Sequence, residues 1–130
     1  MTAAEMFNKK FTYAVVGASN NETKFGYQVL MDLHDAGYQV VPINLHEDKV
    51  MGLKAYHKIS DYPGSFDVVV FVVPPAATEE VLKEVKQKGI KNVWMQPGAE
   101  SEKALAYCKE NRINCVNDDC IMVRRNKEVS

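Results

Sequence analysis

The chain has 130 residues, 46% of them hydrophobic and 25% charged, with a formal net charge of −1 at pH 7. This length argues against a second domain, and the charge argues against a nucleic-acid-binding surface, which normally carries a clear basic excess. The longest apolar run, residues 68–77, contains two prolines and is too short to span a bilayer. We therefore expect one domain, residues 1–130, that binds neither nucleic acid nor membrane.

The cysteines and the N-terminus indicate where the protein is located. Cys108, Cys115 and Cys120 are an odd number and lack the spacing of a metal site. Free thiols persist in a reducing cytoplasm, and residues 1–10 contain no apolar stretch typical of a signal peptide. We expect a cytoplasmic protein without a bound metal.

The first part of the chain contains two predicted strands on either side of a predicted helix. Residues 11–16 are rich in β-branched and aromatic side chains and stop at Gly17, which predicts a strand. Apolar side chains then repeat at helical spacing over residues 25–36, and a glycine follows, as at many helix ends. Residues 38–43 predict the second strand.

The middle of the chain contains the clearest strand. Residues 45–52 are polar and irregular, residues 54–59 predict a short edge strand, and residues 61–64 predict a turn. Residues 67–73 read DVVVFVV, an apolar run without alternation. Such a run is typical of a parallel strand that is covered on both faces.

The last part of the chain repeats the helix–strand pattern. Thr78 is predicted to cap a helix, residues 92–95 predict a strand, and Ser101 is predicted to begin another helix. Residues 113–116 predict the last strand, and the charged residues 124–130 predict a solvated tail. Strands therefore alternate with helices. This order predicts a Rossmann-like, doubly wound α/β fold, with a mainly parallel sheet of about five to six strands and helices on both faces.

The first strand is followed by a loop suited to phosphate. Gly17 permits a sharp turn off the strand, and the small residues Ala18 and Ser19 allow a ligand to approach the backbone. Free N–H groups at the start of the following helix favour an anion. Lys24 adds a positive charge, and Gly26 permits close packing. The loop is longer than the Gly-x-Gly-x-x-Gly motif and lacks its second glycine, so an ordinary strand–helix turn is the alternative.

The second strand lacks the acid that NAD-binding domains usually place near its end to hold the ribose hydroxyls. The strand ends in Asn44 instead, and the acids Glu47 and Asp48 come later. This weakens the prediction of NAD without excluding it.

The third strand is followed by Pro74 and Pro75. Two prolines form a stiff apolar rim that suits an adenine or a pantetheine arm. Taken alone, the pair is better explained by Pro74 ending the strand and Pro75 beginning the helix.

Together these loops resemble the CoA-binding domain family, which includes small stand-alone CoA-binding proteins and the N-terminal domains of succinyl-CoA synthetase α subunits and of ADP-forming acyl-CoA synthetases. The resemblance covers about residues 11–122 and is carried by the segments VVGASNNETKFG, GYQVVPINLHEDKVMGLKAYHKISDYPGSFDVVVFVVPPAA and WMQPGAES. It implies that the loops bind coenzyme A through the residues Gly17, Ala18, Ser19, Lys24, Phe25, Gly26, Val41, Pro42, Asn44, Val73, Pro74 and Pro75. The family often has Asn-Pro-Lys where this chain has Asn44-Leu45-His46, so one candidate charge near the 3′-phosphate is lost.

The resemblance also implies that catalysis takes place elsewhere, because full synthetases use a second domain with a phosphorylated histidine. The histidines His34, His46 and His57 have no plausible catalytic partner nearby in the sequence and are interpreted as structural or solvated. We therefore expect no catalytic residues. The predicted function is to bind CoA or acyl-CoA as a carrier, a sensor or a subunit, with a homo-oligomer or protein partner possible.

Two other functions compete with this prediction. One is an NAD(P)-binding Rossmann enzyme or redox sensor, and the other is an interaction subunit whose pocket no longer binds a ligand. Four other residues lie near the later strands. Gln96 could reach a ligand, Asp118 and Asp119 are interpreted as loop or cap residues, and Cys120 is interpreted as half-buried without chemistry.

Overall fold

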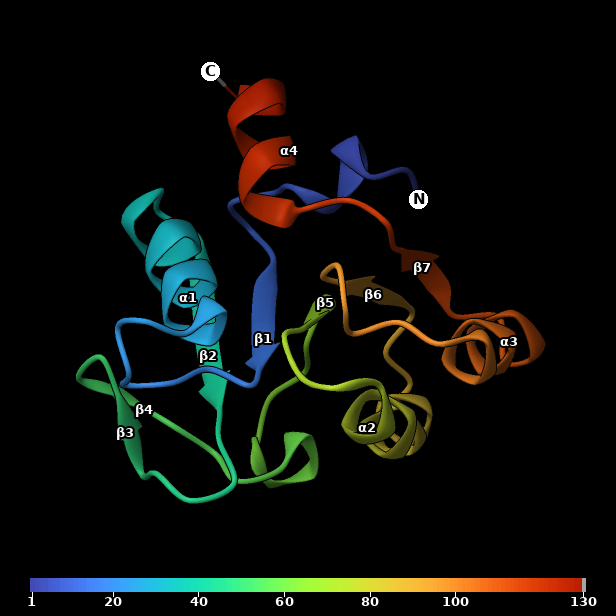
Figure 1. Cartoon of the computed structure of the whole chain (residues 1–130), viewed down its shortest axis with the longest axis horizontal. Helices are drawn as coiled ribbons and strands as arrows, with labels where there is room; N and C mark the ends of the chain where they lie inside the picture. Colours follow the sequence, from blue (N-terminus) through green and yellow to red (C-terminus); the bar gives the residue numbers. More distant parts are fainter. Residues whose placement is uncertain (130) are drawn as a thin grey trace.

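Five parallel strands form the central sheet of this computed structural model, which describes residues 1–129 (Figure 1). Their order across the sheet is β2-β1-β5-β6-β7. The strands are β1 (Thr12–Val16), β2 (Gln39–Ile43), β5 (Val68–Phe71), β6 (Asn92–Met95) and β7 (Asn114–Val116). Each lies where the sequence pattern predicts a long strand.

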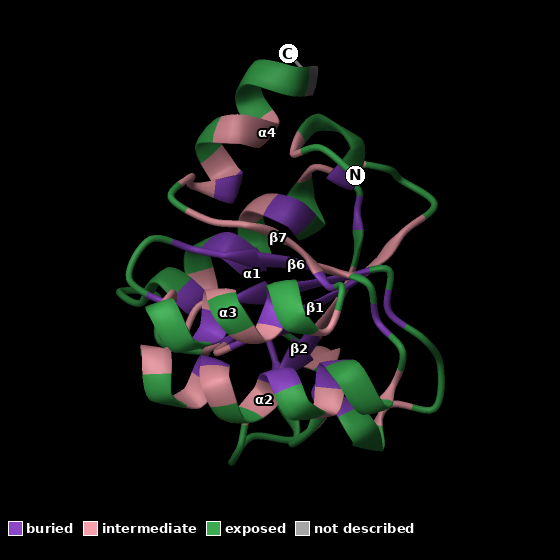
Figure 2. Cartoon of the chain, turned by 90° about the vertical axis from the view of Figure 1, so that its right-hand side faces the viewer, coloured by how far each residue is buried: buried purple, intermediate pink, exposed green. Residues whose placement is uncertain are grey.

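Two helices cover each face of this sheet, which makes the fold doubly wound as predicted (Figures 1 and 2). The helices are α1 (Phe25–Asp35), α2 (Pro75–Gln87), α3 (Glu102–Glu110) and α4 (Ile121–Val129), with the short 3-10 helices η1 (Ala4–Met6) and η2 (Ile59–Asp61). Helices α1 and α4 pack on one face and α2 and α3 on the other. Within residues 1–129, no helix is both long and apolar enough to cross a bilayer.

The apolar run in β5 is buried on both faces, which explains why its sequence does not alternate. Val69 and Phe71 pack in the core shared with α2 and α3, whereas Val68 and Val70 pack in the core shared with α1 and α4. All four side chains are fully buried. Burial of each such side chain stabilises the fold by about 1.5–3 kcal/mol.

The strand order creates a switch point beside β1. From β1 the chain crosses to β2 on one side, and β5 then pairs with β1 on its other side. The crossovers therefore diverge at the carboxyl ends of β1 and β5. Ligands bind in this crevice in open parallel sheets.

The segment between β2 and β5 differs from its prediction. Residues 54–59 do not form an edge strand, because β3 (Lys49–Val50) and β4 (Leu53–Lys54) form a small antiparallel hairpin instead. After this hairpin, Tyr56 makes only a single parallel bridge to Ile43 at the end of β2. Lys54 at the start of the predicted strand belongs to β4, and Ile59 at its end begins η2.

The start of α2 also differs from its prediction. Thr78 is not the N-cap, because the helix already begins at Pro75, with Pro74 as the N-cap. Thr78 is fully buried inside the helix. The interpretation that Pro75 begins the helix is thus confirmed, whereas β5 already ends at Phe71, three residues before Pro74. Ser101 caps α3 as predicted, since its hydroxyl accepts a hydrogen bond from the N–H of Ala104.

The predicted solvated tail from residue 124 is helical as far as the structure describes it, and Ser130 lies outside the described residues. Two arginines attach α4 to the domain. Arg124 pairs with Asp119 at 2.6 Å, and Arg125 pairs with Asp32 of α1 at 2.8 Å. The hydrogen bond to Asp32 raises the pKa of Arg125. The charges that suggested a tail are therefore the contacts that hold the helix in place.

The three cysteines carry free thiols, as predicted. Cys108 of α3 is buried and Cys115 of β7 is half-buried. A hydrogen bond between these two thiols, together with burial, raises the pKa of Cys108. The same hydrogen bond lowers the pKa of Cys115, although burial opposes the effect.

Candidate ligand-binding cavity

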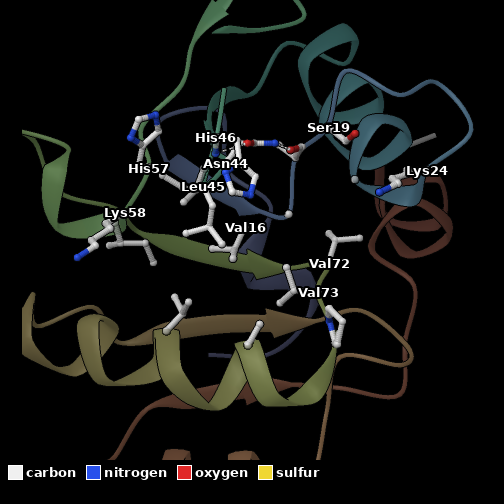
Figure 3. Close-up of a pocket in the computed structure, with 18 of the residues that line it drawn as sticks. Val16, Ser19, Lys24, Asn44, Leu45, His46, His57, Lys58, Val72 and Val73 are labelled. Carbon is white, nitrogen blue, oxygen red and sulfur yellow. Dashed lines mark hydrogen bonds between the residues drawn. The ribbon is translucent and has the colours of Figure 1, made fainter. Parts of the chain in front are cut away.

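A cavity of about 840 Å³ opens at the carboxyl ends of β1, β2 and β5 (Figure 3). Its size lies within the range of small-molecule binding sites. The wall combines the loop after β1, the loop after β2, the first turns of α1 and α2, and residues 57–59. Its residues are Val16, Gly17, Ala18, Ser19, Thr23, Lys24, Phe25, Gly26, Ile43, Asn44, Leu45, His46, His57, Lys58, Ile59, Val72, Val73, Pro74, Ala77, Glu80, Val81 and Glu84.

Two glycines bring α1 close to the end of β1. Gly17 has φ +95°, and a Cβ atom there would overlap the carbonyl oxygen of Val72 and lie 2.7 Å from Cγ1 of Val73. A Cβ atom at Gly26 would overlap the carbonyl oxygen of Gly17. The space that these glycines leave is thus occupied mainly by the chain's own backbone. A larger residue at Gly17 would strain the fold as well as the cavity.

The start of α1 offers hydrogen-bond donors to the cavity. Lys24 occupies the N-cap position of α1, but its side chain forms no capping hydrogen bond with the helix. Within residues 1–129, the backbone N–H groups of Phe25 and Gly26 have no hydrogen-bond acceptor. Lys24 itself lies at the rim, as Figure 3 shows. This arrangement places unpaired amides and a positive charge together, which favours an anionic group.

Asn44 joins the loops after β1 and β2. Its Nδ2 donates to the carbonyl oxygen of Ala18 at 2.8 Å, and its Oδ1 accepts from the N–H groups of His46 and Glu47 at 2.8 and 2.9 Å. An aspartate could accept the last two bonds but could not donate the first. The asparagine at the end of β2 therefore joins the two loops through a donor that an aspartate lacks.

Apolar side chains form the surface between these polar loops. Val16 and Val73 lie in the centre of the cavity (Figure 3), and Val81 of α2 lines it as well. Pro74 at the start of α2 also lines the wall. A ligand with both phosphate and apolar parts matches this combination.

The cavity wall contains nine of the predicted binding residues: Gly17, Ala18, Ser19, Lys24, Phe25, Gly26, Asn44, Val73 and Pro74. It does not contain Val41, Pro42 or Pro75. Val41 packs against the core on the α2 side, and Ile43, two residues further along the same face of β2, lies at the cavity instead. Pro42 is buried in β2, which tolerates a proline because it is an edge strand.

Several cavity residues were not predicted. Ala77, Val81 and Glu84 follow Pro74 at helical spacing, so the helical period could have identified this face of α2. His46 and His57 also lie in the wall. No local pattern places His57 there, because its position depends on how the chain returns after the β3–β4 hairpin.

Gln96 and Cys120 lie away from the cavity, so the predicted contact of Gln96 with a ligand is not supported. Gln96 is buried, and its Oε1 accepts from the N–H of Ile121 at 2.7 Å, while its Nε2 donates to Sγ of Cys120 at 3.4 Å. Asp119 pairs with Arg124, and the described residues contain no cluster of side chains suited to a metal ion. These residues position α4.

Comparison with known protein families gives a match over nearly the whole chain. A family described as "CoA binding domain" matches residues 11–126, which agrees with the resemblance predicted from the loops. A conserved hypothetical protein from Pyrococcus furiosus has 40% sequence identity and a TM-score of 0.84, covering 88% of this chain and 98% of that one. A hypothetical protein from Pyrococcus horikoshii has 27% identity and a TM-score of 0.92, covering 100% and 94%.

Longer enzymes contain a similar segment. The α subunit of acetate–CoA ligase (ADP-forming) II from Pyrococcus furiosus is 41% identical over 81 residues, which are 62% of this chain and 18% of that subunit. The acetate–CoA ligase (ADP-forming) of Methanocaldococcus jannaschii is 35% identical over 77% of this chain and 14% of the ligase. An uncharacterized Bacillus subtilis protein is 28% identical over 92% of this chain and 88% of its own length. The chain therefore spans less than a fifth of each of these two ligases.

Proposed function

Because the chain belongs to the CoA-binding domain family, we propose that its cavity binds coenzyme A or an acyl-CoA and that the chain catalyses no reaction of its own. The observation that carries the proposal is the start of α1, where unpaired N–H groups and Lys24 face one cavity. These donors suit the pyrophosphate of CoA, because hydrogen bonds to a charged group are the strongest ones available. The apolar side chains beside them suit the adenine and the pantetheine arm.

The end of β2 supports CoA over NAD(P). A dinucleotide-binding domain usually holds the ribose hydroxyls with an acid at this position. Here Asn44 occupies it, and its amide oxygen and nitrogen are both used in bonds within the loops. A ribose hydroxyl could donate to the amide oxygen only by displacing one of the two backbone N–H groups that it already accepts from. NAD(P) binding remains the alternative that the experiment below tests.

The proposed role is that of a carrier, a sensor or a subunit of a larger assembly in the cytoplasm. The ligases with similar segments are much longer than this chain, and the matched part is only 18% and 14% of the two. No catalytic role follows from the cavity itself. A protein partner that carries out chemistry on the bound thioester is one form of this proposal.

The direct test combines native mass spectrometry with thermal shifts in CoA, acetyl-CoA, NAD⁺ and NADH. Ligand at 100 times its dissociation constant adds about 2.7 kcal/mol to the free energy of unfolding. We expect CoA to stabilise the protein and the nicotinamide cofactors to have little effect. Stabilisation by NADH alone would favour the dinucleotide alternative, and no effect of any ligand would contradict the proposal.

A matched pair of variants assigns the effect to this cavity. Ala77 lines the cavity on the first turn of α2, whereas the neighbouring Ala76 is exposed and does not. Ala77→Phe should fill the space and remove the CoA-dependent stabilisation. Ala76→Phe adds the same side chain at the adjacent position and should retain it. Equal CoA-dependent shifts in both variants would contradict the cavity assignment.

A further inference from the structure

Two of the three cysteines lie against each other at the end of the sheet opposite β2. Cys108 is on the buried face of α3, and Cys115 is the middle residue of β7. Both pack in the core between the sheet and helices α2 and α3, and their thiols are joined by a hydrogen bond. Figure 1 shows α3 beside β7. Neither cysteine lines the cavity, so this pair is separate from the candidate ligand site.

A short connection between α3 and β7 holds the two thiols together. The helix ends at Glu110 and the strand begins at Asn114. The N–H of Ile113 donates back to the carbonyl oxygen of Cys108 at 2.8 Å, and the N–H of Asn114 donates to the carbonyl oxygen of Lys91 at 2.7 Å. These bonds attach the start of β7 both to the helix and to the segment before β6. A disulfide requires its two side chains to face each other, and the thiol–thiol contact meets this requirement.

The two thiols differ in access and in acidity. Cys108 is buried, whereas Cys115 is partly exposed on β7, the last strand in the order of the sheet. The hydrogen bond from Cys108 lowers the pKa of Cys115, and a bond from Asn117 acts in the same direction against the effect of burial. The protonated Cys115 thiol can also donate to the carbonyl oxygen of Val116 at 3.7 Å. Because the thiolate is the nucleophilic form, Cys115 is the more reactive of the two.

We propose that Cys108 and Cys115 form a peroxide-sensitive dithiol, in which Cys115 reacts with hydrogen peroxide or an organic hydroperoxide and Cys108 then closes a disulfide. An accessible thiolate beside a second thiol is the arrangement that such a reaction requires. The inference goes beyond the proposed function and does not rest on it. It gives the half of the domain that lies away from the cavity a chemistry of its own.

The reaction has two steps. The sulfur of the Cys115 thiolate attacks one oxygen of the peroxide, the O–O bond breaks, and the sulfur becomes a sulfenic acid. The other oxygen leaves as hydroxide or alkoxide and takes up the proton that the thiol lost, giving water or an alcohol. The sulfur of Cys108 then attacks the sulfenic sulfur, the S–O bond breaks, and the hydroxyl leaves as water with the proton of Cys108. The peroxide gains the two electrons that the pair of thiols loses, and a reducing thiol restores the pair by exchange.

Peptide mapping of the folded protein tests the proposal. The reduced protein is treated with hydrogen peroxide, its remaining thiols are alkylated, and it is digested with trypsin without reduction. Trypsin cuts after Lys109 and Arg112, which separates Cys108 from Cys115, whereas Cys120 stays on the same peptide as Cys115. We expect the two peptides to be linked, the intact protein to lose two hydrogen atoms, and dithiothreitol to reverse both changes.

Three matched variants assign the link. Cys120→Ala should keep it, because Sγ of Cys120 contacts Nε2 of Gln96 instead of the pair. Cys108→Ala should abolish the link and leave a sulfenic acid on Cys115 that dimedone captures. Cys115→Ala should slow the loss of the Cys108 thiol by about tenfold, because burial disfavours the reactive thiolate.

The same experiment can contradict the proposal in two ways. Peptides that stay unlinked while the cysteines gain oxygen atoms would mean that the two thiols do not close a disulfide. A link that disappears in Cys120→Ala would mean that Cys120 provides the second sulfur. Either result from the folded protein would overturn the assignment of Cys108 and Cys115 as a reactive pair.

Discussion

The edge of the sheet formed by the carboxyl ends of its strands differs between its β2-β1-β5 half and its β6-β7 half. All five strands are parallel, so all of their carboxyl ends lie at the same edge. At β2, β1 and β5 the following loops leave a cavity of about 840 Å³. At β6 and β7 the described residues instead contact the start of α4: Gln96 is buried and accepts from the N–H of Ile121, and the indole N–H of Trp94 donates to the carbonyl oxygen of Asp119 at 2.9 Å.

The difference between the halves is a difference in helix capping. Helices α1 and α2, which begin at the cavity, have no side-chain cap within the described chain. Helices α3 and α4 begin in the other half, where Ser101 accepts from the N–H of Ala104 at 3.0 Å and Gln96 accepts from that of Ile121 at 2.7 Å. Every parallel strand can direct a helix start toward this edge. Side-chain caps determine which of those starts remain available to a ligand.

The largest expected effect contrasts glycines in the two halves. In Gly26→Ala the new Cβ would overlap the backbone of Gly17, whereas in Gly98→Ala it would meet nothing within 4 Å. Gly26→Ala should lower the free energy of unfolding by about 3 kcal/mol, the cost of severe overpacking. Gly98→Ala should cost only about 1 kcal/mol, because its φ of +96° disfavours a side chain. Urea denaturation measures both values, and similar losses would contradict the close packing of α1.

The next largest effect concerns the half of the sheet edge at β6 and β7, which we call the closed half. Gln96→Ala leaves the buried N–H of Ile121 without its acceptor and should lower the free energy of unfolding by about 2 kcal/mol. Gln87→Ala, at the exposed end of α2, is the control and should be nearly neutral. CoA affinity should survive in both variants if the closed half has no direct contact with the ligand. Loss of CoA binding in a folded Gln96→Ala protein would contradict the separation of the two halves.

A smaller effect tests whether α4 belongs to the domain. Arg125 and Asp32 form a two-bond ion pair at 2.8 and 2.9 Å. A double-mutant cycle with Arg125→Ala and Asp32→Ala should give a coupling energy of about 1 kcal/mol, the upper end for pairs of this exposure. A coupling energy of zero would instead agree with the solvated tail that the sequence suggested.

The sequence was sufficient for several features that one short segment determines, although the N-cap of α2 was placed at Thr78 and lies at Pro74. The unalternating run in β5 predicted a strand covered on both faces, and Ser101 predicted the start of α3. Gly17 predicted a sharp turn off the first strand, and Gly26 predicted close packing at the start of the helix. Each of these features depends on residues within one or two turns of chain, so composition and period identify them.

The rest depended on contacts between distant segments. The charges of Arg124 and Arg125 suggested a tail because their partners, Asp119 and Asp32, could not be paired with them by inspection. His57 reaches the cavity only because the β3–β4 hairpin returns the chain beside β2. Long-range pairing of this kind leaves no periodic signal, so part of the fold and one end of the candidate site were missed.

The smallest effect concerns the half of the sheet edge that holds the cavity, at β2, β1 and β5. It is a change in CoA affinity and requires no change in the stability of the fold. Lys24→Met keeps the length of the side chain and removes its charge at the cavity rim, and it should weaken CoA binding about three- to fivefold. Lys86→Met is the control, since the exposed Lys86 lies on α2 outside the cavity wall. Binding by the original protein should weaken as ionic strength rises toward about 0.15 M, because salt screens an exposed charge, and Lys24→Met should reduce this dependence. Equal affinity and equal salt dependence in the two variants would mean that the unpaired amides of α1, and not the lysine, attract the anion.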